Sequence, residues 1–335
     1  MTLKPPYKST DMIATREAYG DALLALGKSI PELVVLDGEM ANSLFEEKFA
    51  KAYPQRYFEM FIAEQNMVSV AVGVSKTGFI PVAASFGSFL SRAFDQIRMA
   101  QYSNANIKLA GSHVGVSVGQ DGSSQMALED IAMIRSILNS YIFYPSDAIS
   151  SFKLTEQLIR NQGIGYIRLT REKFPVIYKN EDDFVLGGSK VLCESKKDKA
   201  VIFAAGITVH EALKAYDGLQ KQGINVAVVD LYSVKPLDVV TVRKFAERTS
   251  NVIVVEDHYQ SGGIGEAVAK TLMTNYELQI TSKNGLNTRH SSLVTRNFIH
   301  LSVNKIPHSG SPAETAAYEG INAEAIVKAV KQISQ

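Results

Sequence analysis

The chain has 335 residues, of which 46% are hydrophobic and 21% are charged, a composition typical of a globular protein with about two domains. Its 35 Lys and Arg residues nearly balance its 34 Asp and Glu residues, so its bulk charge does not indicate nucleic-acid binding. Residues 1–9 lack the apolar run of a signal peptide, and no later stretch is apolar enough to span a bilayer. The single cysteine, Cys193, excludes an intramolecular disulfide framework, and we expect a reducing, cytoplasmic setting.

In residues 10–177, apolar runs of strand length alternate with amphipathic stretches of helical period. Strands are predicted at 32–36, 80–84, 107–110, 141–144 and 165–169, and helices at 15–26, 64–75, 88–101, 125–136 and 148–160. Strands separated by helices pair in parallel through right-handed crossovers. The pattern therefore predicts a parallel-sheet α/β domain over 10–177.

Residues 178–199 are polar and charged, and they are predicted to be a linker. The α/β pattern then repeats over 200–335, with strands at 200–204, 225–229, 252–255 and 298–303 and helices at 210–221, 237–247, 265–274 and 323–333. Within it, 281–296 is polar, turn-rich and without periodicity, so we expect an exposed insertion there. The predicted fold class is α/β, with two consecutive parallel-sheet domains.

Polar and aromatic residues collect directly after the predicted strands of the first domain. In an open parallel sheet, ligands bind outside the carboxyl ends of the strands. These ends carry Asp37, Glu39, Asn42, Ser43, Ser85, Phe86, Ser88, Phe89, Ser112, His113, Ser146, Asp147, Thr170 and Arg171. Taken singly, the serines also fit helix N-caps and the acids also fit exposed loops, but together these residues predict a site at this edge of the sheet.

The remaining motifs give weaker signals. The glycines of 262–265 (GGIG) follow a predicted strand, but Val268 occupies the third small position of a dinucleotide fingerprint, so close packing of a helix start is favoured. The six histidines show no metal-ligand spacing, and no metal site is predicted within this chain. Cys193 has no neighbouring base and is expected to be a packed residue rather than a nucleophile.

The segment 62–67 (IAEQNM) resembles the glutamate motif of thiamine-diphosphate enzymes, with Glu64 at the start of a predicted helix. A series of further segments resembles transketolase, in the same order along the chain. These are 93–99 (AFDQIRM), 111–113 (GSH), 120–122 (QDG), 125–130 (QMALED), 143–147 (FYPSD), 167–171 (IRLTR), 255–259 (VEDHY), 262–266 (GGIGE), 303–307 (VNKIP), 309–310 (SG) and 312–314 (PAE). The likeness covers about residues 10 to 330 apart from 281–296, and it is closest to the animal-type branch.

The resemblance implies a pyrimidine-binding domain followed by a transketolase C-terminal domain, and thiamine diphosphate as the cofactor. Glu64 matches the family's glutamate, which hydrogen-bonds the pyrimidine N1′ and favours the imino form of the 4′-amino group, the base at thiazolium C2. Phe86 and Phe89 match the aromatic wall around the pyrimidine. Glu39 stands where relatives usually have an aspartate near the cofactor.

The resemblance also implies residues that bind the sugar substrates. His113 and Asp121 match residues that hold the donor's C1 and C2 hydroxyls. We expect His113, together with Glu64, to be a catalytic residue. Gln125 replaces a histidine of other branches and can still donate a hydrogen bond, whereas Gln120 replaces a glutamate.

A second group of matched residues implies an anion site for the sugar phosphate. These residues are Arg16, Ser43 and Arg171. Paired arginines suit this role because their guanidinium groups form charge-assisted, forked hydrogen bonds with phosphate oxygens. Arg92 is assigned no contact, because some relatives have tyrosine there.

In a full transketolase, a pyrophosphate-binding domain with the ligands for Mg²⁺ (or Ca²⁺) precedes the region matched here. Because Met1 stands only a few residues before 14–16 (ATR), we expect one subunit of a split transketolase, with a fragment as the alternative. The resemblance then implies an α2β2 assembly with a pyrophosphate-binding partner subunit. The implied reaction moves a two-carbon ketol unit from a ketose phosphate such as xylulose 5-phosphate to an aldose phosphate such as ribose 5-phosphate, in the pentose phosphate pathway.

Three alternatives remain open. The β subunit of a 2-oxo acid dehydrogenase has comparable length and domain order, but Arg16, Ser43, His113 and Arg171 argue for sugar phosphates. Deoxyxylulose-phosphate synthase needs the other half covalently attached. A non-catalytic scaffold is disfavoured by the presence of Glu64 together with the two donor-binding residues.

Overall fold

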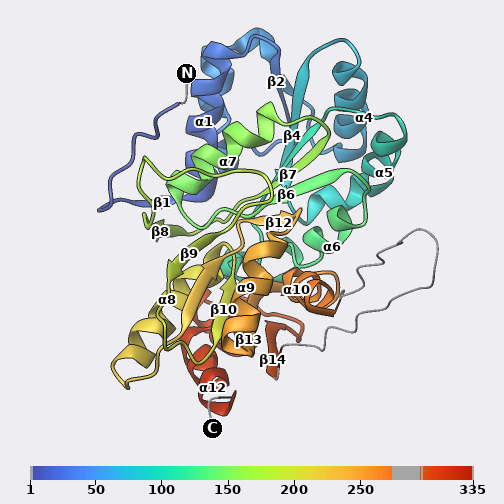
Figure 1. Ribbon diagram of the computed structural model, residues 1–335. Helices are drawn as coiled ribbons and strands as arrows, with labels where there is room; N and C mark the ends of the chain where they lie inside the picture. The colour runs from blue at the N-terminus through green and yellow to red at the C-terminus, as the bar shows by residue number, and fades with distance from the viewer. Residues whose placement is uncertain (1–2, 274–294, 296, 334–335) are drawn as a thin grey trace, which may run out of the picture.

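The computed structural model describes residues 3–273, 295 and 297–333 of the chain. It contains two α/β units arranged end to end, with the amino terminus on one unit and the carboxy terminus at the far end of the other (Figure 1). Each unit is built on a mostly parallel sheet, so the predicted fold class is confirmed. The predicted insertion, 281–296, lies outside the described residues except for residue 295.

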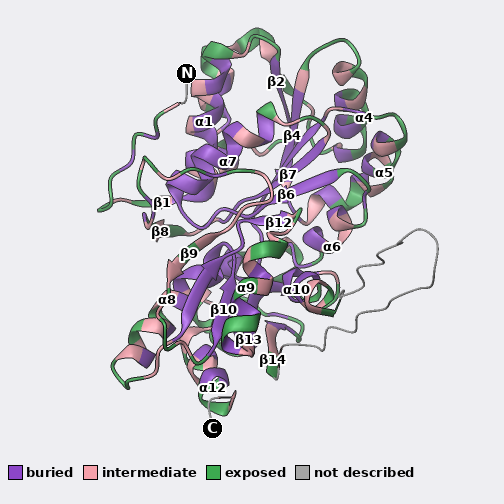
Figure 2. Ribbon diagram, viewed as in Figure 1, coloured by how far each residue is buried: buried purple, intermediate pink, exposed green. Residues whose placement is uncertain are grey.

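The sheet of the first unit has seven strands in the order β12-β6-β7-β5-β4-β2-β3. Their bounds are Ser233–Lys235, Ser140–Phe143, Ile164–Arg168, Lys108–Ser112, Ile80–Phe86, Leu33–Asp37 and Tyr57–Glu59. All neighbours pair in parallel except β12, which lies antiparallel to β6. β2 and β7 are buried at every position, as expected for strands covered on both faces (Figure 2).

Two layers of helices cover this sheet. One apolar core joins it to α1 (Thr15–Ser29), α3 (Glu47–Ala52) and α7 (Ala148–Arg160), and another joins it to α4 (Glu64–Ser75), α5 (Phe94–Tyr102) and α6 (Asp130–Arg135). Short elements complete the unit. These are β1 (Met12–Ala14) paired with β8 (Lys173–Pro175), α2 (Ala41–Leu44), and the 3₁₀ helices η1 (Pro54–Arg56), η2 (Phe89–Ala93), η3 (Val116–Asp121) and η4 (Ser123–Gln125).

The second unit has a five-stranded sheet in the order β14-β13-β10-β11-β9. Its strands are Asn297–Val303, Asn251–Tyr259, Val201–Ala204, Ala227–Asp230 and Lys190–Cys193, and its helices are α8 (Ile207–Gln220), α9 (Val239–Thr249), α10 (Ile264–Met273), α11 (Pro312–Glu319) and α12 (Ala323–Ile333). β9 pairs antiparallel with β11. Since β9 lies in 178–199, the segment predicted to be a linker contributes a strand to this sheet.

Two predicted helices differ from the structure. The helix expected over 88–101 divides at Ala93 into η2 and α5. The helix expected over 125–136 begins only at Asp130, because Ala127 forms a parallel bridge with Val114, just after the end of β5. There, the Gly115 N–H donates to the Ala127 carbonyl at 2.9 Å, and the Ala127 N–H donates to the His113 carbonyl at 3.3 Å.

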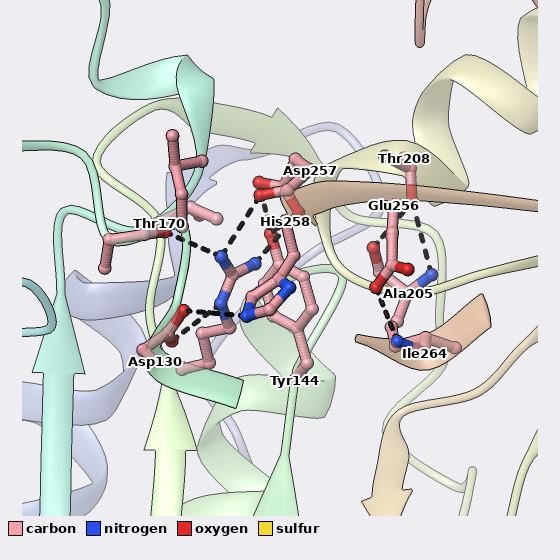
Figure 3. A network of polar contacts seen from close by, with 12 residues as sticks. Asp130, Tyr144, Thr170, Ala205, Thr208, Glu256, Asp257, His258 and Ile264 are labelled. Carbon is pink, nitrogen blue, oxygen red and sulfur yellow. Dashed lines mark hydrogen bonds and ion pairs between the residues drawn. The ribbon is translucent and has the colours of Figure 1, made fainter. Parts of the chain in front are cut away.

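A buried polar network joins the two units. Arg168, at the end of β7, is fully buried, and its Nε donates to Asp130 Oδ2 at 2.8 Å while its Nη1 donates to Asp257 Oδ1 at 2.9 Å. Tyr144 OH also donates to the Asp257 carboxylate, at 2.8–2.9 Å (Figure 3). Asp130 begins α6 of the first unit and Asp257 lies in β13 of the second. Because a buried guanidinium needs carboxylate partners, this network fixes how the units meet.

Candidate active site

The carboxyl group of Glu64 lies at the carboxyl edge of the first sheet, on the first residue of α4. Glu64 is only 3% exposed. Its Oε1 accepts a hydrogen bond from Arg92 Nη1 at 2.7 Å and one from Ser85 Oγ at 3.5 Å. Ser85 lies in β4 and Arg92 in η2, which follows β4 directly. Strand β4 and the 3₁₀ helix that follows it therefore supply the two partners of this carboxyl.

Three stacked rings lie next to this pair. The ring centroids of Phe86 and Phe89 are 5.3 Å apart, and those of Phe86 and His113 are 3.8 Å apart, and the ring planes in each pair are nearly parallel. The Arg92 guanidinium lies over the Phe89 ring, 4.4 Å from its centroid. We refer to Glu64, Arg92, Phe86, Phe89 and His113 as the carboxylate–aromatic cluster.

Predicted anion-binding residues meet beside this cluster. Arg16, at the start of α1, donates from Nη1 to the Ser43 carbonyl at 2.6 Å and from Nε to the Arg171 carbonyl at 3.3 Å. Arg171 Nη1 lies 3.3 Å from Asp121 Oδ1. Ser43 thus takes part here through its backbone. Burial, followed by the charge of Arg171, lowers the pKa of Arg16, as expected for cations held close together.

His113 connects the two groups. Its Nδ1 is 3.0 Å from Ser112 Oγ, and its backbone is left-handed, with φ of 56°. Burial lowers its pKa to about 3, with further lowering by the charges of Arg16 and Arg171. The imidazole is therefore neutral near pH 7. Among the described residues, no hydrogen bond to Nε2 is present, so this nitrogen keeps its capacity to donate or accept.

Gln125 lies at the end of η4, at the margin of the cluster. With Phe89 and Arg92 it lines a cavity of about 520 Å³, which also reaches Tyr259 of the second unit. Its Nε2 donates only a long hydrogen bond, 3.5 Å, to Ser124 Oγ. An amide in this position can turn toward a molecule in the cavity.

Glu39 stands apart from the other predicted site residues. It is exposed, has a φ of 65°, and its N–H donates to Glu59 Oε1 at 3.1 Å. Among the described residues, no hydrogen bond or ion pair joins it to the carboxylate–aromatic cluster. The neighbouring Asp37 is buried and accepts hydrogen bonds from the N–H groups of Met40 and Ala41. Asp37 therefore holds the turn that carries Glu39.

Arg92 contacts Glu64 and Phe89, and the sequence does not predict either contact. Phe89 and Arg92 are three residues apart in η2, and side chains at this spacing eclipse one another in a 3₁₀ helix. The spacing alone therefore indicates the cation–π contact once η2 is known to be 3₁₀. The ion pair with Glu64 spans 28 residues and has no local signal.

The arrangement fits a pyrimidine ring. Both hydrogen bonds that described residues make to the Glu64 carboxyl go to Oε1, which leaves Oε2 for a ring nitrogen, and the Phe86 and Phe89 rings are only half-buried. Within the described ranges, no three His, Cys, Asp or Glu side chains gather as a metal site would require. Among the same residues, no helix combines the length and apolar character needed to cross a membrane.

Two α/β units in this order, with a buried carboxyl beside stacked rings at one sheet edge, have the architecture of a thiamine-diphosphate enzyme. Family models for the transketolase pyrimidine-binding domain and the transketolase C-terminal domain match residues 11–176 and 189–306. The chain belongs to the transketolase family.

Individual relatives agree with this assignment. Transketolase-like protein 2 of Mus musculus is 49% identical over 99% of this chain and 50% of its own length, and transketolase of Homo sapiens is 45% identical over 98% and 50%. The chain thus spans about half the length of these curated relatives. A solved structure described as "Split gene transketolase, inactive beta4 tetramer" is 35% identical, with a TM-score of 0.82 over 97% of this chain and 99% of that one.

Proposed function

We propose that this chain is the pyrimidine-binding subunit of a split transketolase. With thiamine diphosphate, it would transfer a two-carbon ketol unit from a ketose phosphate such as xylulose 5-phosphate to an aldose phosphate such as ribose 5-phosphate. The reaction belongs to pentose phosphate metabolism, and the single cysteine favours a cytoplasmic setting. Membership of the transketolase family disfavours the β subunit of a 2-oxo acid dehydrogenase.

The proposal depends mainly on the surroundings of the Glu64 carboxyl. It is nearly buried, oriented through one oxygen by Arg92, and flanked by half-buried phenylalanine rings. Thiamine diphosphate supplies the carbon centre for ketol transfer when its pyrimidine lies in such a site. Glu64 would hold the proton at the pyrimidine N1′, and Phe86 and Phe89 would orient the ring and exclude water.

The substrate roles follow from charge and protonation. A neutral His113 can hydrogen-bond a donor hydroxyl without repelling the nearby arginines. Asp121 would accept from a second donor hydroxyl, and Gln125 would donate from the cavity wall. Arg16 and Arg171 would bind the phosphate, releasing part of the Arg171 pairing with Asp121. Glu39 has no contact that adds to these roles, so its proximity to the cofactor stays a prediction.

The same site supports the need for a partner chain. Phe61 and Ile62, which lead into Glu64, are 66% and 69% exposed, and Phe58 on the edge strand β3 is 49% exposed. Such apolar surface beside a site is typical of an interface. We infer that a pyrophosphate-binding subunit covers it and supplies the Mg²⁺ (or Ca²⁺) ligands, in an α2β2 assembly. The description of the split-gene relative's tetramer as inactive is consistent with this inference.

A reconstitution assay tests the proposal. The chain is mixed with a candidate partner that carries the pyrophosphate-binding domain, thiamine diphosphate, Mg²⁺, xylulose 5-phosphate and ribose 5-phosphate. Turnover is expected only in the mixture, and Glu64→Gln should lower kcat by about 100-fold or more because the amide cannot hold the N1′ proton. The exposed Glu47→Gln serves as the matched control and should retain full activity. Turnover by the isolated chain, or turnover of pyruvate in place of ketose phosphates, contradicts the proposal.

A further inference from the structure

The loop that carries two of the substrate residues lies between the two units. It runs from His113 through η3 to Asp121. On its first-unit side, Arg171 Nη1 donates to the Val118 carbonyl at 2.9 Å and pairs with Asp121 at 3.3 Å. The arginine thereby holds the loop on the side that faces the site.

The other side of this loop rests on α11 of the second unit. Thr315 is 1% exposed, and its Oγ1 donates to the Val116 carbonyl at 2.9 Å, across 199 residues of sequence. Two carbonyls of α11's own first turn lie slightly farther from the same hydroxyl, at 3.0 and 3.2 Å. A hydroxyl has one proton, so these three carbonyls share or compete for it, and the Val116 carbonyl is the one that belongs to η3.

Two glycines allow the second unit to come this close. Gly119 has a φ of 72°, and a Cβ there would lie 2.9 Å from the Gly310 carbonyl oxygen. Gly115 has a φ of 68°, and a Cβ there would lie 1.7 Å from an Asp257 carboxylate oxygen. Both positions require glycine for conformation and for space. The loop is therefore fitted to the surface of the second unit.

The attachment on this side is mostly apolar, with Val116 and Val118 fully buried in a core cluster that includes Ala316 of α11. Ser117 is 2% exposed, and its hydroxyl makes no hydrogen bond within the described residues. It lines a cavity of about 290 Å³ bounded by α8 and α11. Apolar contacts therefore hold η3 against the second unit, and the hydrogen bond from Thr315 fixes the direction of the Val116 carbonyl.

We propose that Thr315 of the second unit is a positioning residue that fixes η3, so that Asp121 and His113 meet the donor sugar. The kinetic consequence of this inference rests on the proposed function. The inference also deepens that function, because the second unit then helps to set the affinity for the donor sugar. In Thr315→Val the shape of the side chain is kept and the hydrogen bond is lost. The KM for the ketose phosphate should rise about 10-fold, and kcat should fall by a smaller factor, because Asp121 would hold a hydroxyl that does not react, whereas C2 of the ketose is a carbonyl that changes during the reaction.

Two measurements test this inference. In the isolated chain, hydrogen–deuterium exchange of the amides of 115–121 should quicken in Thr315→Val and return to the parental rate in Thr315→Ser, which keeps the hydroxyl. Thr155→Val is the matched control, because Thr155 is fully buried and its hydroxyl donates to a carbonyl within α7, away from η3. In the reconstituted enzyme, the rise in KM should likewise be reversed by serine.

Each outcome separates this inference from the proposed function. If the parental mixture does not turn over, the proposed function fails, and the exchange data still decide whether Thr315 holds the loop. Exchange at 115–121 that is the same in Thr315→Val and parent overturns the inference. So does a loss confined to kcat, or a serine variant that behaves like the valine variant.

Discussion

At the scale of single residues, the ion pair between Arg92 and Glu64 is the contact most specific to this site. The arginine side chain is 47% exposed and the glutamate side chain 3% exposed, so one partner is solvated and the other is not. Removing the guanidinium leaves a nearly buried carboxylate with only a long hydrogen bond from Ser85. The pair therefore orients Glu64, and it also stabilises the fold.

A double-mutant cycle on Arg92→Leu and Glu64→Gln measures this contribution. We expect Arg92→Leu to lower the free energy of unfolding by about 1–2 kcal/mol. This is the contribution of a charge-assisted hydrogen bond, made smaller by the solvent exposure of the arginine. In the Glu64→Gln background the same change should cost less than about half as much, which gives a coupling energy near 1 kcal/mol. Urea unfolding of the isolated chain provides both values.

The exposed pair of Arg98 and Asp95 is the matched control for this cycle. Its side chains are 45% and 68% exposed, so its coupling energy should be below about 0.5 kcal/mol. Equal coupling in the two pairs would mean that the burial of Glu64 adds nothing to its ion pair.

The residues of the site differ in how far sequence alone can predict them. Glu64 is placed correctly at a helix start because the acid and the apolar period that follows are local features. Its partner Arg92 depends on where β4 turns into η2, which local pattern does not determine. Ser43 has its predicted neighbour Arg16, but through the backbone carbonyl, which a motif of side chains does not encode.

At the scale of elements, the central strands were predictable and the edge strands were not. β2, β4, β5, β6 and β7 are apolar runs that lie where the sequence predicts them. β9 and β12 are short, and each pairs antiparallel with a strand far from it in sequence. Their pairing depends on tertiary contacts rather than on their own pattern. The shortened α6 has the same cause, since Ala127 is drawn into pairing beside Val114.

The start of α7 gives a prediction at this scale. Asp147 Oδ1 accepts from the Ser150 N–H at 2.7 Å in a capping box, and Oδ2 accepts from the N–H groups of Ile177 and Tyr178 at 2.9 and 3.0 Å. Asp147→Ala therefore leaves three backbone donors without their partner. We expect the free energy of unfolding to fall by about 2–4 kcal/mol, the sum of a lost cap and buried unpaired N–H groups.

Asp238, the N-cap of α9, offers the comparison. Among the residues that the structure describes, its side chain accepts from one backbone N–H, that of Thr241, and from the hydroxyl of Ser189. Asp238→Ala should cost about 1 kcal/mol by chemical denaturation. Equal losses in the two variants would contradict the role of Asp147 in tying α7 to the segment that leads out of the first unit.

At the scale of the whole molecule, the two units form one folded body. A single core cluster contains Leu109 and Tyr144 of the first unit together with Phe203 and Val254 of the second. The Arg168 network and the η3–α11 contact lie on this shared surface. The second unit thus contacts the loop that carries the predicted donor-binding residues.

Asp230 makes the stability of this junction depend on pH. It is fully buried at the end of β11 and accepts, through Oδ2, from the hydroxyls of Ser146 and Tyr178 at 2.7 Å each. Burial raises its pKa from 3.8 to about 7. Between about pH 4 and pH 7 the folded chain therefore binds more protons at this site than the unfolded chain does. Its contribution to the free energy of unfolding falls as pH rises through this window and stays low above it.

Asp230→Asn should reverse that loss. The asparagine oxygen can accept the same two hydrogen bonds and cannot ionise, so the difference in free energy of unfolding between variant and parent should shift in favour of the variant by more than about 1 kcal/mol between pH 4.5 and pH 8. Thermal unfolding across this range gives the difference directly. Burial raises the pKa of Asp37 to about 6, so Asp37 adds a pH dependence of stability with the same sign. This added dependence is the same in the variant and the parent, so it cancels when the two are compared at each pH. Thr155→Val is the control, because it removes a buried hydrogen bond within α7 and does not contact Asp230, so its pH profile should stay parallel to that of the parent. A constant difference between Asp230→Asn and parent from pH 4.5 to 8 would show that Asp230 does not titrate in this window.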